Sequence, residues 1–333
     1  GMITDLDTSR LLIADQLNGI SQIMKNLSVS IDQDISFDNG KEMAIIGELS
    51  NNEIVCNDAI VFQKDNYTTN VNILVRNQDV QNERIKDIVS KVCGTTLEIQ
   101  EVTPSNLKGW TMINLATTAN FDIMFGYAGE CKNGETVSGD KFSVLRLNDS
   151  KFLMAICDGM GSGELANKTS CLAISLVENF YKAGFDNEII LSSINKLLSI
   201  NNDENFTALD LCVIDLKNCF ADFIKLGAPA GFIKHTDTTT QLNGGALPIG
   251  ILEEIKPVLY KTVLDNQDMV VLCSDGIVDA FKNSENLKVY INNLDTSHPQ
   301  KLADSILDKA KLLDLGNVND DMTVVVGRVY KKY

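Results

Sequence analysis

The chain has 333 residues, a length that predicts about two domains. Its 45 acidic and 29 basic side chains give a net charge of −16, which argues against a nucleic-acid-binding protein and against docking on an anionic membrane surface. Eight cysteines without a CxxC pair indicate buried thiols in a reducing compartment, and two histidines leave little material for a histidine relay or a zinc enzyme.

The first predicted element is a helix over residues 8–28. Its apolar residues recur at spacings of 4, 3, 4 and 3: Ile13, Leu17, Ile20, Met24 and Leu27. This is an a/d seam over two heptads, which must be covered in the folded protein. We favour packing within its own domain, and dimerisation through this helix stays open.

A small α/β domain is predicted over residues 29–110. Its expected elements are a helix at 41–49, strands at 54–63 and 70–76, a helix at 82–93 closed by Gly94, and a strand at 96–102. No catalytic constellation is visible in this region. The turn-rich segment 104–109 is the expected boundary with the next domain.

The remaining residues, 111–333, are predicted to form one larger domain. Its expected elements are strands at 120–128, 142–147 and 152–157, helices at 166–181 and 187–198, four or five strands between 207 and 274, a helix from Pro299 to Leu313, and a strand at 321–330. A tight turn at 148–150 makes two of these strands antiparallel. Hairpin-linked strands with helices grouped between them predict an α+β fold of antiparallel sheets covered by helices.

Carboxylates border three apolar runs of this larger domain. Asp158 and Asp275 each follow such a run and each precede a glycine, and Asp320 begins a third run. If these strand ends lie at one edge, their oxygen atoms converge on a hard divalent cation such as Mg²⁺ or Mn²⁺. Asp140 lies just before the strand that precedes the Asp158 strand, and a hairpin would bring it to the same edge.

The chemistry expected of this cluster is hydrolysis at phosphorus. Two cations about 4 Å apart can hold and acidify a water, which then attacks in line. Asp158 is the candidate bridging ligand, and Gly159 lets its own carbonyl approach a cation. Asp275 and Asp320 would complete the second metal, and Asp140 would ligate a metal or orient its water.

Other phosphate chemistries fit less well. Residues 161–166 match G-x-G-x-x-A between a strand and a helix, but the charge of Asp158 lies where a dinucleotide pyrophosphate would bind, and no acidic residue ends a second strand about 20 residues later. The chain has no G-x-x-x-x-G-K-[ST] loop, no cysteine followed six positions later by arginine, and no G-x-S-x-G frame.

Six segments together resemble the metal-dependent protein phosphatases of the 2C type. They are VSGD (137–140), AICDGMGSGELA (155–166), LGAPAGFI (226–233), LPIG (247–250), LCSDGIVDAF (272–281) and NDDMTVVV (319–326). The spellings DGMGSGE and GAPAGF resemble the stage II sporulation protein E family most, whose members are serine phosphatases of endospore-forming bacteria. The helix at 8–28 and the α/β domain also resemble the regulatory region of that family.

The resemblance implies a β-sandwich of two antiparallel sheets flanked by helices, with two Mn²⁺ or Mg²⁺ ions at one end. By motif, Asp158 resembles the bridging ligand, Gly159 the carbonyl ligand, Asp275 and Asp320 the ligands of the second metal, and Asp140 the acidic residue near the first. The implied substrate is phosphoserine on an anti-anti-sigma factor that controls a sporulation sigma factor. A phosphatase fold that binds or senses without turnover is the alternative.

The resemblance also bears on location. Family members carry a multi-span membrane region upstream, whereas this sequence contains no run of about 18 apolar residues. Gly1 before Met2 indicates a cloning remnant. We therefore expect the chain to be the cytoplasmic part of a membrane-anchored protein, and Met2 as the natural start stays open.

Overall fold

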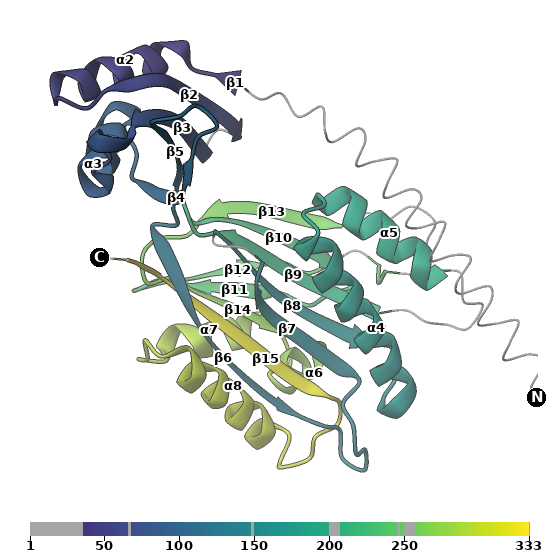
Figure 1. The fold of residues 1–333 in the computed structure, drawn as a ribbon. Coiled ribbons are helices and arrows are strands. Elements are labelled where there is room, and N and C mark those ends of the chain that lie inside the picture. Colours follow the sequence, from purple (N-terminus) through teal and green to yellow (C-terminus); the bar gives the residue numbers. More distant parts are fainter. Residues whose placement is uncertain are drawn as a thin grey trace, which may run out of the picture. The chain divides into compact units, whose positions relative to one another are not determined.

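The structure is a computed structural model, and it describes residues 36–65, 68–147, 150–199, 207–245, 247–249 and 257–332. Within these ranges the chain divides into two compact units, of which the smaller ends at Ala119 and the larger begins at Asn120 (Figure 1). The helix expected at 8–28 and the turn residues Asn148 and Asp149 lie outside the described residues. Every helix within the described ranges is too short or too polar to cross a lipid bilayer.

The smaller unit is built on sheet A, which has five antiparallel strands in the order β1-β2-β3-β5-β4. These strands are β1 (Ser36–Phe37), β2 (Cys56–Asp65), β3 (Thr68–Arg76), β4 (Leu97–Pro104) and β5 (Trp110–Thr117). Its helical segments are α2 (Asn39–Asn51), η1 (Asn77–Asp79) and α3 (Asn82–Cys93). The helices and strands predicted in this region all form, with small shifts at their ends.

Alternating burial explains how this unit is stabilised. Along β3 every second residue is buried, including Val71 and Ile73, so one face of the sheet is apolar. Leu49 of α2 and Val89 of α3 are part of the same core, so both helices cover that face. Helix α3 ends where Gly94 adopts a left-handed φ of 69°, as predicted from the sequence.

The boundary expected at 104–109 is wrong, because β5 belongs to the smaller unit. Strand β5 pairs with both β3 and β4. The segment before it is a hairpin turn in which Ser105 N–H donates to the carbonyl of Trp110 and Trp110 N–H donates to the carbonyl of Leu107. A cluster of turn residues marks a hairpin as readily as a linker, so the composition of the segment could not separate the two.

The larger unit contains two further antiparallel sheets. Sheet C has the order β13-β10-β9-β8-β7, with β7 (Asp140–Arg146), β8 (Lys151–Gly159), β9 (Thr207–Asp215), β10 (Phe220–Leu226) and β13 (Val258–Val263). Sheet B has the order β12-β11-β14-β15-β6, with β6 (Phe121–Glu130), β11 (Gly231–Lys234), β12 (Thr239–Leu242), β14 (Met269–Cys273) and β15 (Met322–Lys331). Six strands thus lie between Thr207 and Ser274, where four or five were predicted.

Helices cover the outer faces of both sheets (Figure 1). Sheet C packs against α4 (Gly163–Lys182) and α5 (Asn187–Ser199). Sheet B packs against α6 (Asp275–Ala280), α7 (Ser284–Asn293) and α8 (Pro299–Leu313), of which α6 and α7 were not predicted. The predicted α+β fold, a sandwich of two antiparallel sheets flanked by helices, is confirmed.

One close contact sets the packing between the two sheets. In β8, Leu153 and Ala155 belong to the core under α4 and α5, so Met154 faces the opposite way, toward sheet B. A Cβ atom at Gly327 of β15 would lie 2.6 Å from the Met154 sulfur and 2.9 Å from the Cδ1 of Ile123. Glycine at position 327 therefore makes room for Met154 between the sheets.

Candidate metal centre

Three of the predicted carboxylates meet at one end of the sandwich. Strands β7 and β8 are neighbours, and their register places Asp140 directly opposite Asp158, both facing the space between the sheets. Asp275 is the first residue of α6, immediately after β14 and Ser274. Burial, followed by the negative charges of Asp140 and Asp275, raises the pKa of Asp158 to about 10. The structure thus brings Asp140, Asp158 and Asp275 together from three strand ends.

Asp140 is the most deeply buried of these carboxylates, with 5% of its surface exposed. Its Oδ2 accepts a hydrogen bond of 2.7 Å from the Thr323 hydroxyl. Its Oδ1 is buried and has no hydrogen-bond partner among the residues that the structure describes. Burial raises the pKa of Asp140 to about 7. A buried carboxylate oxygen without a donor is what an oxygen-binding cation would require at this position.

The adjacent residues Asp320 and Asp321 differ in what their carboxylates contact. Asp321 is buried, and its two oxygens accept hydrogen bonds from Lys132 N–H at 2.9 Å and Gly139 N–H at 2.7 Å. Asp320 is partly exposed and uses Oδ1 for the N–H of Asp321, at 2.9 Å. Burial and the charge of Asp275 raise the pKa of Asp320. Asp320 therefore faces the acidic cluster, whereas Asp321 holds the segment that leads into Asp140.

Gly159 has a steric role that the sequence did not suggest. A Cβ atom there would overlap the carbonyl oxygen of Ala166 and lie 2.8 Å from the Ser170 hydroxyl oxygen, both in α4. The Ser170 hydroxyl donates to the carbonyl of Gly139 at 2.5 Å, and Gly159 N–H donates to the same carbonyl at 3.3 Å. Glycine at position 159 thus permits α4 to pack against the strand ends that carry Asp140 and Asp158.

Two further polar side chains tie the strand ends together. The hydroxyl of Ser274 accepts from Thr323 N–H at 2.9 Å and donates to the carbonyl of Asp321 at 3.3 Å. The hydroxyl of Thr323 in turn donates to Asp140. From the sequence, no role was assigned to Ser274, Thr323 or Asp321, although all three lie within the segments 272–281 and 319–326. Small polar side chains at the ends of apolar runs were the feature of the sequence that could have indicated these supporting hydrogen bonds.

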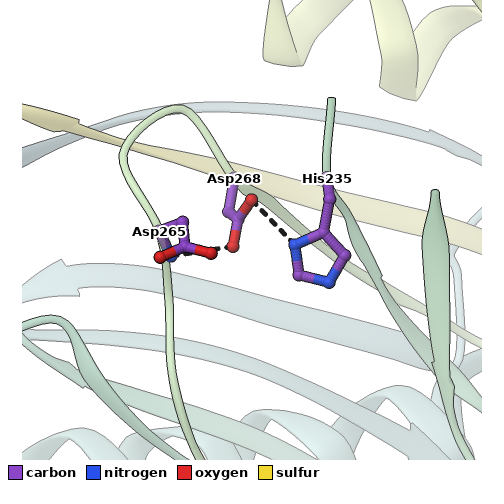
Figure 2. Close-up of side chains that lie close together, drawn as sticks. All are labelled: His235, Asp265 and Asp268. Atoms are coloured by element: carbon purple, nitrogen blue, oxygen red, sulfur yellow. Dashed lines mark hydrogen bonds and ion pairs between the residues drawn. The ribbon is translucent and has the colours of Figure 1, made fainter. Parts of the chain in front are cut away.

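A second cluster, His235, Asp265 and Asp268, could in principle hold a metal ion (Figure 2). Asp268 lies just before β14, at the opposite end of that strand from Asp275. The two ring nitrogens of His235 contact Asp268 Oδ1 at 2.9 Å and the Thr240 hydroxyl at 3.1 Å. The other oxygen of Asp268 accepts from Asp265 N–H at 2.8 Å. Because the ring nitrogens of His235 and the carboxylate oxygens of Asp268 already have hydrogen-bond partners, we infer that this cluster stabilises the turn before β14.

Comparison with known proteins gives the family. The family model described as stage II sporulation protein E (SpoIIE) matches residues 148–330, and that of the SpoIIE regulatory domain matches residues 2–115. Stage II sporulation protein E of Priestia megaterium is 29% identical over 97% of this chain, and that of Bacillus subtilis is 30% identical over 96%. The chain spans 57% and 40% of the lengths of these two relatives.

Solved structures agree with this assignment. The phosphatase domain of B. subtilis SpoIIE with a fragment of its regulatory domain has a TM-score of 0.72 at 28% identity, over 98% of this chain and 97% of that one. The phosphatase RsbX in complex with magnesium has a TM-score of 0.52 at 18% identity, over 69% of this chain and 99% of that one, and shows the fold alone. The chain therefore belongs to the stage II sporulation protein E family of PP2C-type serine phosphatases, as its motifs predicted.

Proposed function

We propose that the chain is a metal-dependent protein serine phosphatase that hydrolyses phosphoserine on an anti-anti-sigma factor and so controls a sporulation sigma factor. The observation that carries this proposal is the convergence of Asp140, Asp158 and Asp275, with a buried oxygen of Asp140 left unpaired. Clustered carboxylates with raised pKa values signal negative charge that lacks compensation.

The residues of this cluster fit two Mn²⁺ or Mg²⁺ ions. Asp158 and the carbonyl of Gly159 would hold the ions, Asp275 and Asp320 would complete the second site, and Asp140 would lie at the first. An all-oxygen ligand set favours these hard cations. When bound, such ions activate a water near neutral pH and neutralise charge that develops on phosphorus. RsbX, of the same fold, has been solved in complex with magnesium.

The protein's own groups position the reacting atoms. Thr323 donates to Asp140 Oδ2 and thereby leaves Oδ1 as the acceptor that can orient an attacking water. Asp321 fixes the segment at Lys132 and Gly139, so Asp140 cannot move independently of β15. This rigid support is what orientation-dependent catalysis requires.

A folded protein substrate is favoured by the surroundings of the cluster. Directly after Gly159, Met160 is 59% exposed, and Leu165 at the start of α4 is 69% exposed. Apolar side chains beside the cluster offer contacts that a small phosphate ester cannot use. Two relatives by sequence, RsbX and RsbU of B. subtilis, are named phosphoserine phosphatases. Remote contacts of this kind can supply binding energy that orients the phosphoserine.

The test compares two substrates in the presence of Mn²⁺. The full chain should hydrolyse p-nitrophenyl phosphate, and it should hydrolyse phosphoserine on a folded anti-anti-sigma factor with a much higher kcat/KM than on a short peptide. Met160→Ser with Leu165→Ser should lower kcat/KM for the folded partner and leave p-nitrophenyl phosphate hydrolysis unchanged. Absence of metal-dependent hydrolysis of either substrate would favour a non-catalytic binding module, and equal kcat/KM for peptide and partner would remove the case for a dedicated protein substrate.

The proposal extends to regulation by the N-terminal region. We assign residues 1–28 to a regulatory or dimerising helix. The next residues, up to Ala119, form a small regulatory domain, and the larger unit carries out catalysis. The chain spans 57% and 40% of the lengths of two relatives, and we place it in the cytoplasmic part of a membrane-anchored protein, as the family resemblance implies. Sedimentation of the full chain and of a Leu17→Asp variant tests dimerisation through the helix.

A further inference from the structure

Two cations face the same cavity at the end of sheet B remote from the acidic cluster. Register pairs Met269 of β14 with Lys234 of β11 on one side and with Arg328 of β15 on the other. Residues in one such row point to the same face, which here is the face that carries Phe232 and Val326 in the core under α7 and α8. Lys234 and Arg328 therefore lie two strands apart, about 10 Å between backbones.

Lys234 is a buried lysine without a carboxylate partner. Only 7% of its surface is exposed, and among the described residues no acidic oxygen lies within ion-pair distance of its Nζ. Its one recorded hydrogen bond goes to the carbonyl of Asn292, at a long 3.4 Å. Asp295 acts on it only from a greater distance, and burial lowers the pKa of Lys234. An unpaired buried ammonium group is costly, and an anion bound beside it would offset that cost.

Arg328 is the second unpaired cation of this row. Its side chain is half-buried, and within the described part of the chain its guanidinium takes part in no recorded hydrogen bond or ion pair. A guanidinium presents a planar fork of N–H donors that matches phosphate and carboxylate oxygens. In a protein of net charge −16, two such unpaired cations facing one cavity are unusual.

The cavity is large and polar enough for a small anion. Its volume is about 470 Å³, and besides Lys234, Arg328 and Met269 its lining includes four residues that carry a hydroxyl or an amide group: Thr236, Asn292, Thr296 and Ser297. Asp295 and His235 also border it, and the His235 ring is held by Asp268. A phosphate group carries oxygens in several directions, whereas the two oxygens of a carboxylate lie in one plane. A cavity with two cations and several hydroxyl or amide side chains therefore suits phosphate better.

We propose that this cavity, the cation pocket, binds a small phosphate-bearing anion, either inorganic phosphate or a phosphate monoester, with Lys234 and Arg328 contacting the phosphate oxygens. The pocket lies beyond the start of β14, whereas Asp275 follows its end, so a ligand here is separate from a substrate at the acidic cluster. It is an effector site and does not depend on the proposed phosphatase activity.

Calorimetric titration of the full chain tests this, in buffer freed of divalent ions by resin so that no chelator competes. We expect inorganic phosphate to bind with a Kd below about 1 mM. Arg328→Gln should weaken it at least about tenfold, since hydrogen bonds between charged groups are the strong ones. Lys309→Gln removes an equal charge at a different cavity, which Lys309 lines together with Phe281 and Tyr290. Asp158→Asn alters the acidic cluster. Both variants should bind phosphate as the wild type does. Tighter binding of AMP than of phosphate identifies a monoester pocket, and the reverse identifies a phosphate pocket.

Lys234→Met separates binding from a structural role. If Lys234 awaits an anion, this variant should have an equal or higher Tm in phosphate-free buffer, because the unpaired buried charge is gone, and phosphate should no longer raise the Tm. If Lys234 only supports Asn292, the variant should melt lower and phosphate should shift both proteins equally. That second result, or phosphate binding unchanged in Arg328→Gln, would overturn the proposal.

Discussion

The two units bury polar groups very differently. Among the described residues of the smaller unit, Thr69 is the one buried polar side chain, and its backbone is paired with the hydroxyl of Thr117. The larger unit buries charged residues: Asp140, Asp210, Asp268, Asp321, Lys225 and Lys234. Of these, Lys225 and Asp210 form an ion pair at 2.7 Å between the sheets, whereas Asp140 and Lys234 have no partner of opposite charge within the described ranges.

This difference distinguishes residues that stabilise the fold from residues that could bind a ligand. A strand whose residues alternate between core and surface, such as β3, stabilises the smaller unit without any buried charge. Buried charges without partners lower stability, so their concentration in the larger unit marks the places where a ligand is expected. The following predictions test whether that distinction holds.

The largest effect is expected from removing a central carboxylate. Asp158→Ala or Asp275→Ala should lower kcat at least about 10³-fold in Mn²⁺, because metal ions supply several kcal/mol of charge stabilisation. Each variant should remain folded, and its metal-free Tm should rise, because the cost of burying the Asp158 carboxyl beside other carboxyl groups is reduced. Near-wild-type turnover of either variant would contradict the assignment of Asp158 and Asp275 as metal ligands.

A matched substitution in the smaller unit should show the opposite behaviour. Ile73 is fully buried in sheet A. Ile73→Ala should destabilise that unit by about 2–5 kcal/mol in denaturant unfolding. At temperatures where the variant stays folded, its kcat with p-nitrophenyl phosphate should match the wild type. A large loss of kcat in this variant would mean that the core of the smaller unit affects turnover at the acidic cluster of the larger unit.

Substitutions of the two aspartates just before β15, Asp320 and Asp321, should have different effects, one on metal dependence and the other on stability. Asp320→Asn should raise the Mn²⁺ concentration for half-maximal activity by tenfold or more. Asp321→Asn should act mainly on stability, by about 1–3 kcal/mol, since the amide leaves Lys132 N–H or Gly139 N–H without an acceptor. Metal titrations and thermal melts of both variants check this. Reversed effects would show that Asp321 is the ligand.

Removing the smaller unit should have a moderate effect on metal dependence. The truncation should begin at Asn120, because a cut near residue 110 would divide sheet A. If the N-terminal region biases the metal centre, half-maximal activity should shift in Mn²⁺ concentration by about 5- to 150-fold, equivalent to about 1–3 kcal/mol. Leu17→Asp with Ile20→Asp should reproduce the shift. Identical metal dependence in all three proteins would limit the helix to packing.

The smallest effect concerns pH. The pKa values of Asp140 and Asp158 rise from 3.8 to about 7 and about 10, so the folded state keeps protons that the unfolded chain has released. The stability this contributes is complete below about pH 4 and is lost as pH rises through about 7 and then toward 10. Metal-free melts from pH 5 to 9 should therefore show a falling Tm. Asp140→Asn should flatten the lower part of that decline, and an unchanged slope would contradict the assignment.

The sequence predicted the acidic cluster because a hairpin places Asp140 opposite Asp158 whatever the rest of the fold does. It also predicted the end of α3 at Gly94, since that rule is local. It missed α6, whose few residues carry no periodic pattern. It could not show the row of Lys234, Met269 and Arg328, because that row depends on the pairing of strands distant in the chain.

The contact between Gly327 and Met154 has a mechanical consequence for the metal centre. Asp158 lies four residues beyond Met154 in sheet C, and Asp320 lies two residues before β15, the strand of sheet B that carries Gly327. The Met154 thioether packs against the Cα side of Gly327, so this contact joins the strand that carries Asp158 to the strand that follows Asp320. A methyl group added at position 327 would displace the Met154 thioether and the end of Ile123 without touching any carboxylate, so a change in the apolar middle of the sandwich would reach the strands that lead to the acidic groups.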